Sequence, residues 1–173
     1  MILFWLIGGL LLFPASTPAP RVPDSMDPVA VPNYAVLRPG VAAAGQPTPD
    51  ALRQLKTQGF RTVINIRTEA EGPKGEEEIV KGLGLRYVSI PVTPETLSLE
   101  DVRAVAKLLD DPEAAPVLFH CASSNRVGGV IAVIEGLAGK SLEEAEVAGR
   151  KAGLHSPAMV QAVRRLLGSV PKP

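Results

Sequence analysis

Residues 116–128 read Pro116-Val-Leu-Phe-His-Cys-Ala-Ser-Ser-Asn-Arg-Val-Gly128. An apolar run leads into His120 and Cys121, a short polar loop reaches Arg126, and an apolar helical pattern follows Gly128. This order predicts a strand, a tight loop and a helix, whose backbone N–H groups and dipole converge on one point and form an anion site. Such a site favours the thiolate form of Cys121, and Arg126 adds a planar fork that suits phosphate or sulfate.

Apolar strands alternate with amphipathic helices on both sides of this segment. Strands are expected at 33–38, 41–44, 60–66, 85–90 and 116–120, and helices at 49–58, 76–83, 99–109, 128–138, 142–152 and 157–167. Helix N-caps are expected at Thr48, at Ser98 and at Ser141, where Glu144 completes a capping box. The alternation predicts an α/β fold with a mostly parallel central sheet flanked by helices.

Composition limits the classes of function. The chain of 173 residues carries 18 basic and 18 acidic side chains, so its net field does not favour nucleic acid or a membrane surface. One cysteine excludes an internal disulfide, and one cysteine with two histidines supplies too few ligands for a typical zinc site. We therefore expect neither a metal nor another cofactor.

The chain is expected to divide into three parts. Residues 1–19 contain the apolar run Ile2 to Phe13 and predict a signal peptide or an N-terminal membrane anchor, and therefore an exported, periplasmic or secreted protein. Residues 20–32 are rich in proline and predict an extended linker. A single folded domain is expected over residues 33–170.

Polar side chains cluster where three predicted strands end. Arg67, Glu69 and Glu71 follow one strand, Thr93 and Glu95 follow another, and Cys121 follows the third. Ligands of α/β sheets bind beyond the carboxyl ends of the strands, so these groups are expected to converge. Two alternatives stand for Arg67: it pairs with Glu69 or Glu71 at the strand end, or it faces the substrate.

The loop and several other segments carry a family resemblance. His120-Cys121 resembles the start of the loop of cysteine-dependent tyrosine and dual-specificity phosphatases, although only four residues separate Cys121 from Arg126. Three further motifs fall in the expected order: Ala44-Gly-Gln-Pro47, Gly59-Phe-Arg-Thr-Val-Ile-Asn-Ile-Arg67 and Tyr87-Val-Ser-Ile-Pro-Val92. Together they resemble the bacterial beta-lactamase-hydrolase-like, phosphatase-like domains, which belong to that superfamily and use a similarly shortened loop.

This resemblance implies a cysteine-phosphatase-like fold and a chemistry. Cys121 would attack a phosphomonoester, free or on a protein, and form a phosphocysteine that water hydrolyses. Arg126 and the loop backbone would bind the phosphoryl oxygens, and Glu95 is the candidate general acid. The implied substrate-binding residues are His120, Ala122, Ser123, Ser124, Asn125 and, beyond the loop, Arg67.

Two other functions fit the same residues. The four-residue spacing, with Asn125 before Arg126, is also similar to single-domain rhodanese-like sulfurtransferases, in which Cys121 would carry a persulfide. A weakly active phosphate-binding module is the third possibility, because Val127 stands where phosphatases of this kind usually place Ser or Thr.

Overall fold

A computed structural model describes residues 29–72 and 75–170. The predicted leader and most of the predicted linker, residues 1–28, lie outside the described residues. Val29 and Val31, which the sequence assigns to the linker, are buried at 3% and 6% exposure, so packing already begins at residue 29. Both side chains are apolar and lie against the same core as the first helix, which explains why they join the fold.

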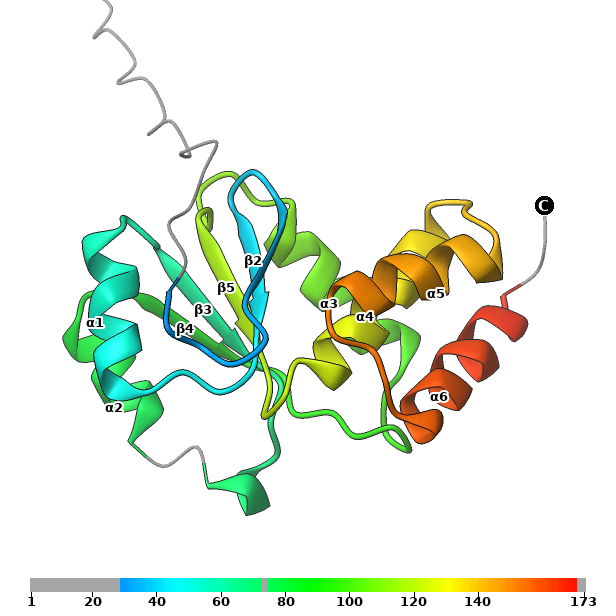
Figure 1. The fold of residues 1–173 in the computed structure, drawn as a ribbon, viewed down its shortest axis with the longest axis horizontal. Helices are drawn as coiled ribbons and strands as arrows, with labels where there is room; N and C mark the ends of the chain where they lie inside the picture. The colour runs from blue at the N-terminus through cyan, green and yellow to red at the C-terminus, as the bar shows by residue number, and fades with distance from the viewer. Residues whose placement is uncertain (1–28, 73–74, 171–173) are drawn as a thin grey trace, which may run out of the picture.

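A five-stranded sheet forms the centre of the molecule (Figure 1). Its spatial order is β1-β2-β5-β3-β4. Strand β1 runs antiparallel to β2, whereas β2, β5, β3 and β4 are parallel to their neighbours. The strands are β1 (Ala35–Arg38), β2 (Val41–Ala44), β3 (Thr62–Asn65), β4 (Arg86–Ser89) and β5 (Val117–His120). The mostly parallel α/β fold expected from the sequence is thus confirmed.

Helices cover both faces of the sheet. Helices α1 (Pro49–Thr57) and α2 (Glu76–Gly82) pack on one face, and α3 (Leu99–Leu109), α4 (Asn125–Leu137) and α6 (Pro157–Gly168) pack on the other. Helix α5 (Leu142–Lys151) lies against α4, away from the sheet (Figure 1). The expected N-caps are confirmed, because Thr48, Ser98 and Ser141 each accept a hydrogen bond from the helix they precede.

The parallel strands bring their carboxyl ends to one edge of the sheet. Ala44 and Asn65 both lie beside His120, the last residue of β5. The pairing continues for one more residue, with Ile66 N donating to His120 O at 3.1 Å and Cys121 N to Ala44 O at 3.3 Å. Cys121 therefore leaves the centre of the sheet with strands on both sides.

Two glycines let the helices approach one another. A Cβ on Gly128 would lie 2.2 Å from Leu154 N, and a Cβ on Gly129 would lie 2.3 Å from Met159 Cε. The contacts lie toward α6 and the α5–α6 connection, so the pair permits close packing within the helical layer.

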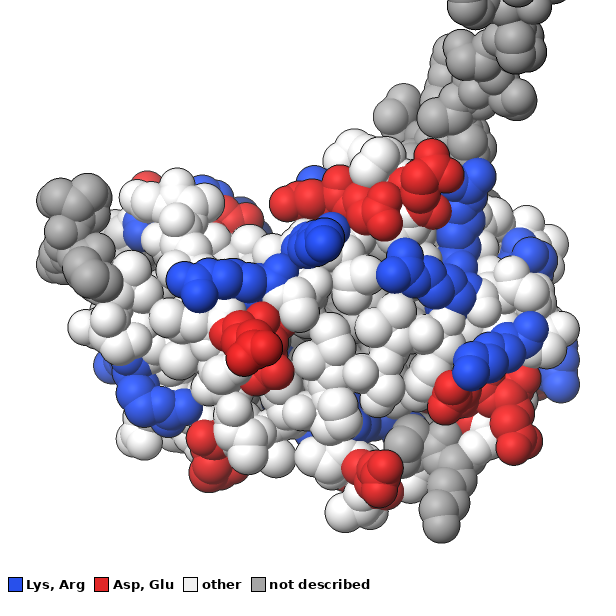
Figure 2. All heavy atoms as spheres, turned by 180° about the vertical axis from the view of Figure 1, so that it is seen from behind, with Lys and Arg blue, Asp and Glu red and all other residues white. Residues whose placement is uncertain are grey.

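The outer surface mixes both signs of charge. Figure 2 shows acidic and basic side chains interspersed over the face opposite to that of Figure 1. Within residues 29–72 and 75–170, no helix combines the length and the apolar character needed to cross a membrane.

Candidate active site

Cys121 lies at the base of the loop that joins β5 to α4, with 1% of its surface exposed. The loop is held on the β2 side, where Gln46 N donates to Ala122 O at 3.1 Å. Ser124 has a φ of 65° and turns the chain into α4, and its hydroxyl donates to Ala152 O at 2.7 Å. Since the first N–H groups of a helix have no intrahelical acceptors, the start of α4 presents free donors beside Cys121.

Asn125 ties the loop to the connection between α5 and α6. Its amide oxygen accepts from His155 N and Ser156 N, both at 2.9 Å, and its amide nitrogen donates to Ser156 Oγ at 2.9 Å. The Asn125 side chain is thus already engaged with the protein, as is the Ser124 hydroxyl. Within the described residues, the Ser124 hydroxyl donates to Ala152 O, whereas the Ser123 hydroxyl makes no hydrogen bond. Ser123 is therefore the loop hydroxyl that can donate to a ligand.

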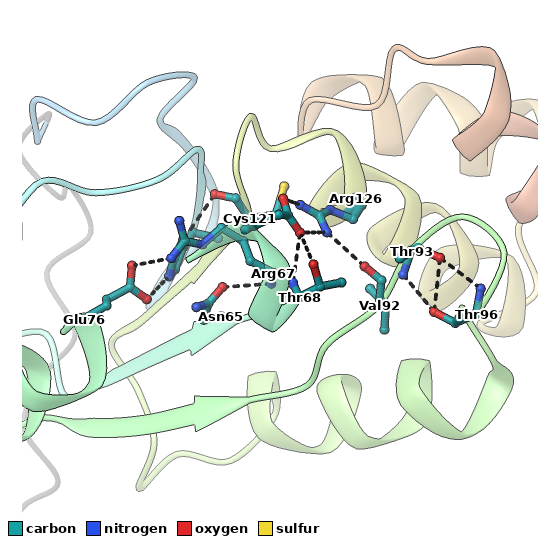
Figure 3. A network of polar contacts seen from close by, with 11 residues as sticks. Asn65, Arg67, Thr68, Glu76, Val92, Thr93, Thr96, Cys121 and Arg126 are labelled. Carbon is teal, nitrogen blue, oxygen red and sulfur yellow. Dashed lines mark hydrogen bonds and ion pairs between the residues drawn. The ribbon is translucent and has the colours of Figure 1, made fainter. Parts of the chain in front are cut away.

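Glu71 and Val92 hold the guanidinium of Arg126, and Figure 3 shows the sulfur of Cys121 beside it. Its Nη1 donates to Glu71 Oε2 at 2.7 Å and to Val92 O at 3.0 Å, and its Nη2 donates to Glu71 Oε1. A guanidinium has five N–H bonds in a fixed plane, so Nε–H and the second Nη2–H remain, next to each other on one edge. This edge is the one that binds a phosphate or sulfate with two parallel hydrogen bonds.

The ion pair between Glu71 and Arg126 shifts both groups toward their charged forms. The hydrogen bond from Arg126 lowers the pKa of Glu71 from 4.5 to about 2. Burial opposes the charge of Arg126, but the hydrogen bonds to Glu71 and the nearby Cys121 outweigh it and raise the pKa of Arg126. Both side chains are therefore held in their charged forms at neutral pH.

Glu71 was not singled out as a partner of Arg126 in the sequence. It sits in a short 3₁₀ helix, η1 (Glu69–Glu71), where its carboxylate also accepts from Thr68 N and Thr68 Oγ1, both at 2.9 Å. The order Thr68-Glu-Ala-Glu71 is a capping-box pattern, which was the available signal for this turn. The pattern predicts the local turn but not the distant arginine it holds.

A second polar cluster lies behind the loop. His120 Nε2 contacts Glu76 Oε1 at 3.0 Å, and Arg67 Nη2 lies 3.6 Å from Glu76 Oε2. The suggested ion pair of Arg67 with Glu69 or Glu71 is therefore wrong. Arg67 lies just after β3 and pairs with Glu76 of α2 in the interior. Glu71 lies in η1 and pairs with Arg126 instead.

Glu95 occupies a separate turn. It is exposed, and its carboxylate accepts from Thr93 Oγ1 at 2.7 Å. Within the described residues, no hydrogen bond or ion pair joins it to Cys121 or Arg126. The hydrogen bond from Thr93 lowers the pKa of Glu95. A general acid must carry its proton near neutral pH, whereas the lowered pKa favours the ionised carboxylate of Glu95. This environment therefore does not suit a general acid.

The site thus combines a buried thiol, a fixed guanidinium edge and the start of a helix. Residues 35–160 match the family model described as DSP-PTPase phosphatase fused to NAD+ kinase. The chain belongs to this family.

Curated relatives support the same assignment. The beta-lactamase hydrolase-like protein of Xylella fastidiosa (strain Temecula1) is 27% identical over 138 residues, which cover 76% of this chain and 32% of that protein. The protein of the same name from Agrobacterium fabrum is 29% identical over 134 residues, covering 74% and 31%. The chain therefore spans about a third of the length of these relatives. The resemblance inferred from the loop and its flanking motifs is confirmed.

Solved structures show the same fold. The complex of Pseudomonas aeruginosa TpbA with pTyr has a TM-score of 0.64 at 17% identity, covering 88% of this chain and 92% of that one. The catalytic core of the PP-IP phosphatase SIW14 from Saccharomyces cerevisiae has a TM-score of 0.64 at 17% identity, covering 79% and 87%. The fold of this chain is accordingly that of the cysteine phosphatases.

Proposed function

We propose that this domain is a metal-independent, cysteine-dependent phosphatase that hydrolyses phosphomonoesters. The observation that carries the proposal is the Nε–Nη2 edge of Arg126, which Glu71 and Val92 O leave open beside Cys121. A phosphoryl group bound to that edge, and to the first N–H groups of α4, has its phosphorus next to the sulfur. The phosphatase family of the chain supports the same reaction class.

The reaction has two steps. The Cys121 thiolate attacks phosphorus, an S–P bond forms, and the bond from phosphorus to the ester oxygen breaks, with that oxygen leaving as the alcohol after it takes up a proton. Water then attacks phosphorus, the S–P bond breaks, and inorganic phosphate and the thiolate are released. Arg126 and the loop amides stabilise the negative charge that spreads over the phosphoryl oxygens in both transition states.

Hydrolysis of an aryl phosphate in the presence of a chelator tests the proposal. We expect turnover in the wild type, with no measurable turnover in Cys121→Ser and a loss of more than about a hundredfold in Arg126→Ala. Tyrosine-phosphorylated peptides measured beside small aryl phosphates show whether proteins are substrates. Turnover that survives Cys121→Ser would rule out a cysteine nucleophile.

The loop of four residues between Cys121 and Arg126 favours one other candidate, a sulfurtransferase. In that reaction the Cys121 thiolate would take the outer sulfur of thiosulfate, release sulfite, and pass the sulfur to an acceptor such as cyanide. Intact mass after incubation with thiosulfate separates the two functions. A persulfide on Cys121 together with thiocyanate formation would replace the phosphatase proposal; we expect neither.

A further inference from the structure

The carbonyl of Cys121 accepts a hydrogen bond from a side chain in the interior. His120 Nδ1 lies 3.3 Å from Cys121 O, and His120 is completely buried. A carbonyl oxygen can only accept, so Nδ1 carries the hydrogen. The other ring nitrogen, Nε2, lies 3.0 Å from Glu76 Oε1. A contact at each nitrogen holds the ring in one orientation, so Glu76 of α2 acts on the Cys121 carbonyl through His120.

This carbonyl belongs to the peptide group that joins Cys121 to Ala122. The bond is trans, because the cis bond found among the described residues precedes Pro116. In a trans peptide the C=O and the N–H point in opposite directions. Since Cys121 O is turned toward the buried His120, Ala122 N–H points away from the interior, and Ala122 is itself exposed. Within the described residues this N–H donates to no acceptor.

The next peptide group of the loop is held in a different way. Gln46 N donates to Ala122 O at 3.1 Å, and Ser123 N–H is likewise without an acceptor among the residues described. That contact joins two main-chain atoms, so it does not depend on a side chain. The direction of Ala122 N–H, in contrast, depends on the side chains of His120 and Glu76.

Stability alone is the competing explanation for Glu76. Its side chain is 6% exposed, and Arg67 Nη2 lies 3.6 Å from Glu76 Oε2 (Figure 3). Removing two charges from water is costly, and apolar side chains in place of a buried ion pair are often neutral or stabilising. An ion pair at this distance is therefore a weak source of stability. The shorter contact of Glu76 with His120 instead orients a group that is bonded to Cys121.

We propose that Glu76 is a positioning residue for the reaction at Cys121. Glu76 holds the His120 ring, the ring holds Cys121 O, and Ala122 N–H is thereby kept aimed at the phosphoryl oxygens. The inference rests on the proposed phosphatase function and adds to it a residue outside the loop. A donor that is already aimed at the developing charge needs no rearrangement during the reaction. Glu76 thus affects catalysis through His120 and the backbone rather than through a contact with the substrate.

Matched double variants test the contact between Glu76 and His120. A substitution of Glu76 alone would leave Arg67 buried without its partner and could unfold the protein, so both charges are removed together. Arg67→Met with Glu76→Gln keeps a side chain that forms a hydrogen bond with Nε2. Arg67→Met with Glu76→Leu keeps a similar volume without that hydrogen bond. Glu78→Gln is the control, because Glu78 is exposed on the same helix, and it should match the wild type.

The two double variants should differ in catalysis and in phosphate binding. For an aryl phosphate, kcat should be at least about tenfold lower with Leu than with Gln at position 76, because a displacement of about 1 Å costs up to about a hundredfold. Inhibition by inorganic phosphate should weaken by about fivefold, which corresponds to one ordinary hydrogen bond. A purely structural role would lower kcat through loss of folded protein and leave the inhibition constant unchanged. That result, or a smaller difference in kcat, overturns the proposal.

Proton–nitrogen NMR of the wild-type protein provides an arm that needs neither a variant nor turnover. We expect His120 Nδ1 to carry a hydrogen that is protected from exchange, and the Ala122 amide signal to shift when inorganic phosphate binds. A bare Nδ1, or an Ala122 signal that does not move at saturating phosphate, overturns the proposal. If both NMR results are as expected but no aryl phosphate is hydrolysed, the phosphatase function is refuted and the positioning role of Glu76 stands.

Discussion

Glu71→Gln removes the charge that holds Arg126 while keeping the size of the side chain. The glutamine oxygen still accepts one hydrogen bond from the guanidinium, but its NH₂ group now faces the second N–H that the carboxylate accepts in the wild type. Arg126 keeps its bond to Val92 O and can swing about that contact. The edge that binds the phosphoryl group is therefore no longer fixed.

The expected losses differ for stability and for catalysis. Hydrogen bonds between charged groups contribute about 1.5–3 kcal/mol, but the Glu71 side chain is 32% exposed and water screens the pair, so we expect a loss of about 1–2 kcal/mol. A misplacement of about 1 Å at a reacting centre costs up to about a hundredfold, and we expect kcat to fall between about 10-fold and 100-fold. Inhibition by inorganic phosphate should not weaken, because the variant removes a negative charge from the site.

The stability effect depends on pH with a defined sign. A carboxyl group whose pKa is lowered by folding stabilises the protein above its unfolded pKa and loses that contribution as the pH falls through its folded pKa. For Glu71 this window extends from 4.5 down to about 2. The difference in unfolding free energy between the wild type and Glu71→Gln should be constant above pH 5 and shrink progressively toward pH 2.

Steady-state hydrolysis of an aryl phosphate and urea unfolding from pH 7 to pH 3 measure both effects. Glu69→Gln is the control, because Glu69 lies in the same 3₁₀ turn and its carboxylate holds no partner within the described residues. We expect this control to match the wild type. An unchanged kcat in Glu71→Gln, or an equal fall in Glu69→Gln, would refute the idea that Glu71 positions Arg126.

Three further substitutions test other parts of the structure. Gly128→Ala should destabilise the protein by about 3 kcal/mol in urea unfolding, because its Cβ would meet Leu154 N at 2.2 Å, whereas Gly82→Ala, with nothing within 4 Å, should be neutral or slightly stabilising. Asn125→Ala should cost about 2 kcal/mol and lower kcat, as three hydrogen bonds to residues 155–156 are lost; equal stability would show that they do not hold the loop. Glu95→Gln should leave kcat within about twofold and the pH profile unchanged, whereas a hundredfold fall would identify Glu95 as the general acid.

Local signals predicted most of the fold. The starts of three helices could be predicted because an N-cap depends on residues only a few positions apart. The predicted caps Thr48, Ser98 and Ser141 are all present. Alternation of strands and helices was enough to indicate a parallel sheet, and the position of Cys121 at a strand end followed from it. The packing partners of Gly128 and Gly129 could not be predicted from the sequence, because a missing Cβ does not indicate which neighbour comes close.

Long-range pairing of charges could not be read in the same way. Arg67, Glu69, Glu71 and Glu76 are close in sequence, and proximity suggested pairs among the first three. In the structure, Arg67 instead pairs with Glu76 in the interior. Glu71 pairs with Arg126, which lies 55 residues further along the chain. Which carboxylate meets which guanidinium depends on the paths of β3 and η1, and these paths are set by packing rather than by charge.

Pre-steady-state hydrolysis, stopped by rapid denaturation, tests the account of Cys121 most directly. The wild-type protein is mixed with an excess of aryl phosphate, quenched within the first turnover, and examined by intact mass and peptide mapping. We predict one added phosphoryl group, located on Cys121, which forms and decays at rates consistent with turnover and does not form in Cys121→Ser. Turnover of the aryl phosphate without a phosphoryl group on Cys121 at any quench time would contradict the account.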